Sequence, residues 1–276
     1  VHQAYKMSAS LALVAALSTL FAGGVIDSKE YQDHGFERHF SLARDPWFRS
    51  VGMFRQGARA SGVWFYRGFV LTTADAAFRP DGTLYAPAEV EFVIPDEFGN
   101  ELAFRGASWF IPKGYLLARE AEDESAAASM NVAILRLDER PAPFGIDPAI
   151  LGFELPMVGA DVVLNGFGQR GLLKSGPRVT EFGAGYGDEP IRALAFRGVV
   201  SLAGVSPASD LPGVATRGDE GGAVFFRESG EWRLSGIIQS SQSQETRVLW
   251  LSPFSRQILK GVVQGSWSDF LDMKTP

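Results

Sequence analysis

Gly218-Asp219-Glu220-Gly221-Gly222 places three glycines around two adjacent acidic residues. The stretch runs directly into Ala223-Val224-Phe225-Phe226, a short apolar run of the kind that forms a strand. Glycine is favoured where a backbone turns sharply or passes close to another segment. The pattern therefore predicts a tight turn that leads into a core strand.

Three further segments occur in a fixed order around this turn. They are Ser61-Gly62-Val63 followed by Val70-Leu71-Thr72-Thr73-Ala74-Asp75-Ala76, then Met130-Asn131-Val132-Ala133-Ile134-Leu135-Arg136-Leu137, and Leu234-Ser235-Gly236-Ile237-Ile238-Gln239. Together with 218–222, they resemble the strands around the active site of the trypsin-like serine proteases, over residues 47–265. The resemblance implies an all-β fold of two six-stranded antiparallel β-barrels that meet near residues 145–158, with a C-terminal α-helix.

The resemblance places Asp75 at the family's histidine, Asn131 at its aspartate and Glu220 at its nucleophilic serine. Acyl transfer by such a triad needs a hydroxyl or thiol that attacks, an imidazole that accepts its proton and a carboxylate that orients the imidazole. None of the three positions keeps its group. The chain has no cysteine, and its histidines, at positions 2, 34 and 39, all precede the first barrel. We therefore expect no protease activity by the usual route and no catalytic residues.

The resemblance also locates the remains of a substrate cleft. Gly218 keeps the position of the oxyanion-hole glycine, although the carboxylate of Glu220 can fill that hole from within. Val214 falls at the base of the primary specificity pocket. Gln239, Ser240 and Ser241 fall along its wall. Such a cleft either still binds peptide or is simply filled.

Asp219 has a structural role in this reading. In active family members, the aspartate before the nucleophile receives the N-terminal amine that activation releases. Cleavage after Gly24 would expose Val25 for that role, and Arg217 is the alternative partner. We therefore predict that Asp219 is buried and paired, because an unpaired buried carboxylate is costly.

Composition supports one double-barrel unit without a cofactor. The chain has 276 residues, of which 46% are hydrophobic, and its glycines and prolines separate short strand-like runs. Only the C-terminal part reads as helix, with Ser252 as the cap and Pro253 at the first position. Gly166-Phe167-Gly168-Gln169-Arg170-Gly171 matches a dinucleotide fingerprint, but Gly176-Pro177 follows too soon for the required helix. We expect no nucleotide, metal or other cofactor.

The N-terminal segment indicates export. Residues 7–26 carry no charge and follow Lys6, so residues 1–26 read as either a cleaved signal peptide or a membrane anchor, followed by an extension over 27–46. Either reading places the barrels in a bacterial periplasm or on the outer face of a membrane, since an exported protein without cysteine is typical of a bacterial envelope. Residues 266–276 form a C-terminal tail.

Three functions remain open. The favoured one is a non-catalytic protein of the cell envelope that binds or scaffolds another protein. The second is an accessory subunit of a membrane complex, held by the N-terminal helix. The third is a non-peptidase hydrolase that uses Asp75 and Glu220 as a carboxylate pair sharing one proton. A net charge of −6, with no basic cluster, argues against nucleic acid as a partner.

Overall fold

The structure is a computed structural model that describes residues 46–55, 60–96, 100–139, 146–156, 161–167, 184–190, 199–203, 215, 218–242 and 245–274. Its strands are β1 (Val51–Phe54), β2 (Ser61–Tyr66), β3 (Phe69–Thr72), β4 (Glu91–Pro95), β5 (Glu101–Pro112), β6 (Ala133–Leu137), β7 (Asp161–Gly166), β8 (Ala184–Pro190), β9 (Val199–Ala203), β10 (Ala223–Glu228), β11 (Glu231–Gln242), β12 (Glu245–Trp250) and β13 (Phe270–Lys274). The α-helices are α4 (Lys113–Glu120), α5 (Glu124–Ser129) and α6 (Ser255–Gln264), and short 3-10 helices are η1 (Pro46–Phe48), η2 (Ala74–Ala77) and η3 (Pro87–Glu89).

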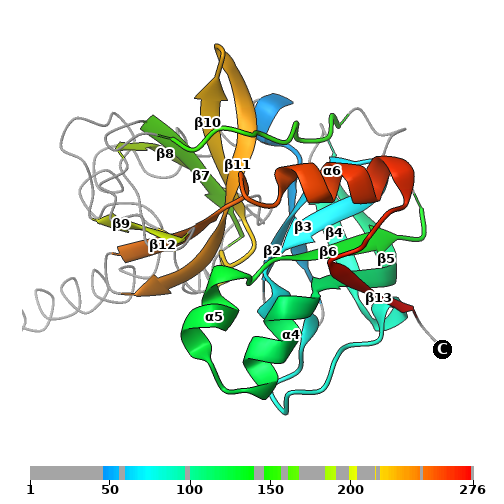
Figure 1. Cartoon of the computed structure of the whole chain (residues 1–276). Helices are drawn as coiled ribbons and strands as arrows, with labels where there is room; N and C mark the ends of the chain where they lie inside the picture. The colour runs from blue at the N-terminus through cyan, green and yellow to red at the C-terminus, as the bar shows by residue number, and fades with distance from the viewer. Residues whose placement is uncertain are drawn as a thin grey trace, which may run out of the picture.

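The first half of the chain forms a closed antiparallel barrel. Its strands follow the order β5-β4-β1-β2-β3-β6, and β6 pairs back with β5 to close it (Figure 1). The long strand β5 makes this closure possible, because its first half pairs with β4 and its second half with β6. β13 then pairs with the end of β5, at Ser108–Pro112, and adds a seventh strand to the sheet.

The second half forms a six-stranded antiparallel sheet in the order β8-β7-β10-β11-β12-β9. The closed barrel, the second sheet and the C-terminal helix α6 confirm the all-β fold class predicted from the sequence. Residues 146–156 connect the two halves, and Leu151 makes a bridge to Leu234 of β11. The sequence analysis placed the meeting of the barrels near residues 145–158, and this boundary stays a prediction.

Several strands bury both of their faces. In β2, Trp64 packs inside the first barrel, whereas Val63 packs into a second cluster that also holds Val163 and Phe225 of the other half. In β7, Val162 and Leu164 pack in the core of the second half, whereas Val163 packs in the cluster shared by both halves. Successive side chains of a strand point to opposite faces, so a strand between two cores reads as a continuous apolar run. A joint core therefore holds the two halves together.

The sequence predicted helix only near the C-terminus, whereas the structure has two further α-helices, α4 and α5. α4 and α5 fill the connection between β5 and β6 (Figure 1). Asp123 caps α5 by accepting a hydrogen bond from the amide of Ala126, and the alanines that follow favour a helix. α6 begins at Ser255, three residues after the predicted cap. Residues 270–274, assigned to a C-terminal tail, form β13.

Candidate functional site

Asp75 and Asn131 are brought together by the pairing of β3 with β6. Thr72, at the end of β3, lies opposite Ala133, at the start of β6, so the residues just beyond them are neighbours. The Asn131 side-chain amide donates to Asp75 Oδ2 at 2.7 Å, and the backbone amide of Asp75 donates to Asn131 Oδ1 at 3.1 Å. The sequence motif thus located both residues of this reciprocal pair.

A third residue completes the arrangement around Asp75. The Tyr115 hydroxyl, from α4, donates to Asp75 Oδ1 at 2.5 Å. Tyr115 is buried, and burial, followed by its hydrogen bond to the Asp75 carboxylate, raises its pKa well above the ordinary tyrosine value. Both carboxylate oxygens of Asp75 thus accept hydrogen bonds from neighbouring side chains. Sequence reasoning missed Tyr115, since no local pattern links it to a residue 40 positions earlier.

Glu220 lies in a tight loop that is attached to the first barrel. Gly218 and Gly221 have φ of +97° and +83°, which side-chain-bearing residues rarely adopt. A Cβ at Gly221 would lie 2.2 Å from both Ser61 O and Thr72 Oγ1, so only glycine fits here. The Ser61 amide donates to the Glu220 carbonyl at 2.7 Å, and Ser61 Oγ donates to the Gly218 carbonyl at 2.9 Å.

The Glu220 carboxylate turns back on its own loop. The Gly218 amide donates to Glu220 Oε2 at 2.5 Å. This is the amide that the family resemblance assigns to an oxyanion hole, and here it donates to the chain's own carboxylate. The pairing of Glu220 with Asp75 that the sequence analysis considered stays a prediction.

Asp219 is completely buried. A Cβ on Gly166, at the end of β7, would lie 2.7 Å from Asp219 Oδ1, so the glycine makes room for this carboxylate. Val25 and Arg217, the two partners expected from the sequence, lie outside the described residues, as do Val214 and residues 168–171 of the dinucleotide-like motif. The pairing of Asp219 stays a prediction.

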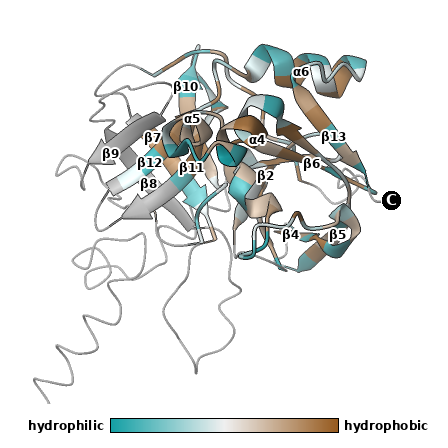
Figure 2. Ribbon diagram, turned by 60° about the horizontal axis from the view of Figure 1, so that its bottom comes forward, coloured by the Kyte–Doolittle hydropathy of each residue, from teal (hydrophilic) through white to brown (hydrophobic). Residues whose placement is uncertain are grey.

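Gln239 connects the second sheet to the α4–α5 segment. Its side-chain amide, from β11, donates to the Ala128 carbonyl of α5 at 2.6 Å, and the residue is buried. Figures 1 and 2 show α4 and α5 on the side of the first barrel that faces β11. Ser240 and Ser241 continue β11 opposite Arg247 and Thr246 of β12. Gln239, which the resemblance assigned to the wall of a specificity pocket, thus makes a contact between the two halves of the molecule.

Neither a metal nor a membrane helix is indicated by the part of the chain that the structure describes. Within those residues, no three His, Cys, Asp or Glu side chains gather closely enough to hold a metal ion. No helix among them is long and apolar enough to cross a membrane. Residues 1–26, which the sequence analysis assigned to export, lie outside this range.

No protein-family model and no curated protein sequence matches this chain. Solved structures do resemble it. One mutant of human heparin binding protein (CAP37), [R23S,F25E], has a TM-score of 0.58 at 16% sequence identity, covering 79% of this chain and 93% of that protein. The [G175Q] mutant of the same protein has a TM-score of 0.55 at 15% identity, covering 80% and 94%. At such low identity the similarity shows the fold alone, and that fold is chymotrypsin-like.

Proposed function

We propose that this chain is a catalytically inactive trypsin-like protein of the cell envelope that binds or scaffolds another protein. The observation that carries the proposal is the hydrogen bond from the Gly218 amide to the carboxylate of Glu220. Acyl transfer needs a nucleophile at position 220 and a free donor for the oxyanion. Glu220 supplies no such nucleophile, and its carboxylate already accepts the hydrogen bond of the Gly218 amide.

Asp75, at the position of the family's proton acceptor, is also already hydrogen-bonded within the chain. Asp75 accepts hydrogen bonds from Tyr115 and Asn131, so both of its carboxylate oxygens already have donors. A carboxylate is also a weaker base than the imidazole that acyl transfer by such a triad needs. Gln239 adds a contact across the cleft wall. The arrangement therefore favours a binding role over hydrolysis, including hydrolysis by an Asp75 and Glu220 pair.

The partner and the location are part of the proposal. The uncharged segment at 7–26 supports export to a periplasm or to the outer face of a membrane, either free or held by that segment. The similar structures belong to a protein named for binding, which supports a binding use of this fold. We propose a protein as the partner, with a membrane complex as the second candidate.

The test combines activity with capture. Wild-type protein and the Glu220→Ser variant are incubated with a fluorophosphonate probe and with a mixed peptide substrate library, with trypsin as the positive control. We expect neither to react, because the variant still lacks an imidazole and triad members act as a unit. Cross-linking in the native membrane fraction should capture a defined protein. Labelling of the wild type at residue 220, or cleavage that Asp75→Ala abolishes, would overturn the proposal.

A further inference from the structure

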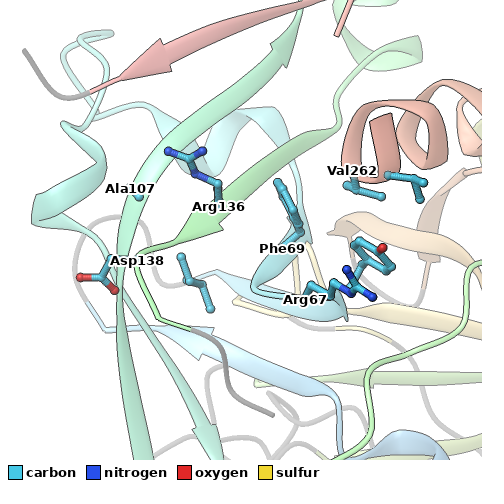
Figure 3. A pocket seen from close by; sticks show the side chains of 9 residues that line it. Arg67, Phe69, Ala107, Arg136, Asp138 and Val262 are labelled. Atoms are coloured by element: carbon cyan, nitrogen blue, oxygen red, sulfur yellow. The ribbon is translucent and has the colours of Figure 1, made fainter. Parts of the chain in front are cut away.

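A hollow of about 560 Å³ opens on the first barrel, and none of the degenerate triad residues lines it. It lies between the β2–β3 turn, strands β5 and β6, and α6 (Figure 3). Its lining residues are Tyr66, Arg67, Phe69, Ala107, Arg136, Leu137, Asp138, Val262 and Val263. The volume lies within the range of sites that hold small ligands or peptide side chains, about 300–1,000 Å³.

Two arginines give the hollow its charge. Arg67 and Arg136 are exposed, and neither forms an ion pair with another residue in the described part of the chain. Asp138 is the one carboxylate among the lining residues. In the view of Figure 3, Phe69 lies between Arg136 and Arg67, and Asp138 lies on the Arg136 side. In a chain with a net charge of −6, a hollow in which two guanidiniums outnumber one carboxylate attracts an anionic group.

An apolar strip continues from the hollow onto α6. Val262 lines the hollow, Val263 is 55% exposed, and Leu259 is 41% exposed one turn before Val263 on the same face of the helix. Figure 2 shows α6 on the outside of the molecule, with apolar and polar residues alternating along it. An inorganic anion would use the arginines but not this strip. A peptide with acidic and apolar side chains would use both.

The backbone at Arg67 adds an independent observation. Arg67 has φ of +23° and Gly68 of +88°, in a two-residue turn that joins β2 to β3. The same kind of turn joins β10 to β11, where Ser229 and Gly230 have φ of +54° and +89°. Asn or Gly favours the first position of such turns, and a long side chain there is unusual. The Arg67 guanidinium lies over the ring of Tyr66, 5.5 Å from its centre, so this turn holds the cation beside another residue of the hollow.

We propose that this hollow binds an acidic segment of the protein partner, in which two carboxylates flank an apolar side chain. One carboxylate contacts Arg67 and the other Arg136, while the apolar side chain packs on Phe69 and against Val262. Alternate residues of an extended peptide point the same way, so an apolar residue two positions from each carboxylate lies on the same side of the backbone as both of them. The proposal rests on the proposed binding function and names the chemistry of its partner.

The test uses NMR of the isotope-labelled full chain with two matched probes. Acetyl-Asp-Ser-Leu-Ser-Asp-amide carries the proposed chemistry, with the three contacting side chains on one side of the extended backbone, and acetyl-Asn-Ser-Leu-Ser-Asn-amide has the same shape without charge. We expect the acidic peptide to shift the Arg67 and Arg136 side-chain NH signals and the Val262 methyl signals saturably. The neutral peptide should bind about tenfold more weakly or worse, since charged hydrogen bonds are roughly twice as strong as neutral ones. Equal binding of the two peptides would overturn the proposal. The proposal would also be overturned if inorganic phosphate bound the hollow as tightly as the acidic peptide does.

Three variants make the test independent of folding. Arg67→Asn supplies a residue that the turn prefers, so we expect unchanged or higher thermal stability and at least about tenfold weaker binding of the acidic peptide. Ser229→Asn makes the same change in the β10–β11 turn and should leave binding unchanged. Asp138→Asn removes the carboxylate of the hollow and should tighten binding. Undiminished binding by Arg67→Asn would overturn the proposal.

Different experimental results would contradict this binding site and the proposed function. A partner captured from the native membrane fraction by Arg67→Asn as well as by wild type would overturn this site and leave the binding function standing. Peptidase activity of the wild type would overturn the proposed function, whatever the peptides do at the hollow.

Discussion

At the scale of single residues, Asp75, Asn131 and Tyr115 form a hydrogen-bonded group. Asp75 is exposed at the surface, but Asn131 and Tyr115 beneath it are buried. The carboxylate therefore gives both buried side chains a hydrogen-bond acceptor, and buried polar groups without partners are costly. This arrangement makes the group of Asp75, Asn131 and Tyr115 a stabilising element of the first barrel.

Tyr115→Phe tests this stabilising role. The change removes the donor to Asp75 Oδ1 and keeps the ring that packs against Phe78. A hydrogen bond to a charged group contributes about 1.5–3 kcal/mol, and the exposure of Asp75 argues for the lower end. We expect the free energy of unfolding at pH 7 to fall by roughly 1–1.5 kcal/mol in urea titrations. Tyr85→Phe, outside this group, is the control, and an equal effect of both changes would contradict the prediction.

The same tyrosine predicts a dependence on alkaline pH. Because its pKa is raised in the folded protein, folding favours the protonated hydroxyl. This contribution is complete below the ordinary tyrosine pKa and is lost as pH rises beyond it, when the unfolded chain deprotonates first. The wild type should therefore lose more stability than Tyr115→Phe between pH 8 and pH 11. Parallel stability curves for the two proteins over this interval would refute the assignment.

At the scale of elements, the sequence predicted what local patterns encode. Glycine-bounded apolar runs located β4, β7 and β10, and the motifs located Asp75, Asn131 and Glu220 near the ends of their strands. The sequence analysis missed α5 although Asp123 and the alanines after it are local helix signals, and it could not locate α4 or β13, for which the decisive information is what they pack against. The bond from Gln239 to Ala128 spans 111 residues and leaves no local trace. Sequence patterns thus predicted the framework of the site but not the contacts that close it.

The packing of α6 against the segment that leads to β13 gives a prediction at this scale. A Cβ on Gly261 would lie 2.4 Å from Cε3 of Trp267, whose ring stacks on Phe110 at 4.2 Å. Alanine is favoured over glycine inside a helix by about 1 kcal/mol, whereas overpacking costs about 1–3 kcal/mol.

We expect packing to dominate in Gly261→Ala, with a lower melting temperature and a changed tryptophan fluorescence spectrum. Gln257→Ala, on the exposed face of α6, should be nearly neutral and serves as the control. A more stable Gly261→Ala protein would show that helix propensity decides here and that Trp267 moves aside freely.

At the scale of the whole molecule, the two halves share one core and one set of connecting hydrogen bonds. The shared cluster combines side chains from β2, β3 and β6 with others from β7, β10 and β11, and α6 and β13 add Ile258 and Phe270. Ser61 connects the halves directly, because its hydroxyl donates to the Gly218 carbonyl and accepts from the Phe167 amide. Separation of the halves would expose this core and break these bonds together.

We therefore predict that the two halves unfold as one cooperative unit, and that Ser61→Ala destabilises both equally. The variant leaves the Gly218 carbonyl and the Phe167 amide without their partner, at about 1–3 kcal/mol for each group left unsatisfied. Native-state hydrogen exchange follows the Trp64 amide, which bonds to Ser50 in the first barrel, and the Ile238 amide, which bonds to Gly222 in the second half. Both opening free energies should converge on one value in the wild type and fall by the same amount in Ser61→Ala. If Ser61→Ala lowered the opening free energy of the Ile238 amide alone, the two halves would open separately. That result would contradict the prediction of one cooperative unit.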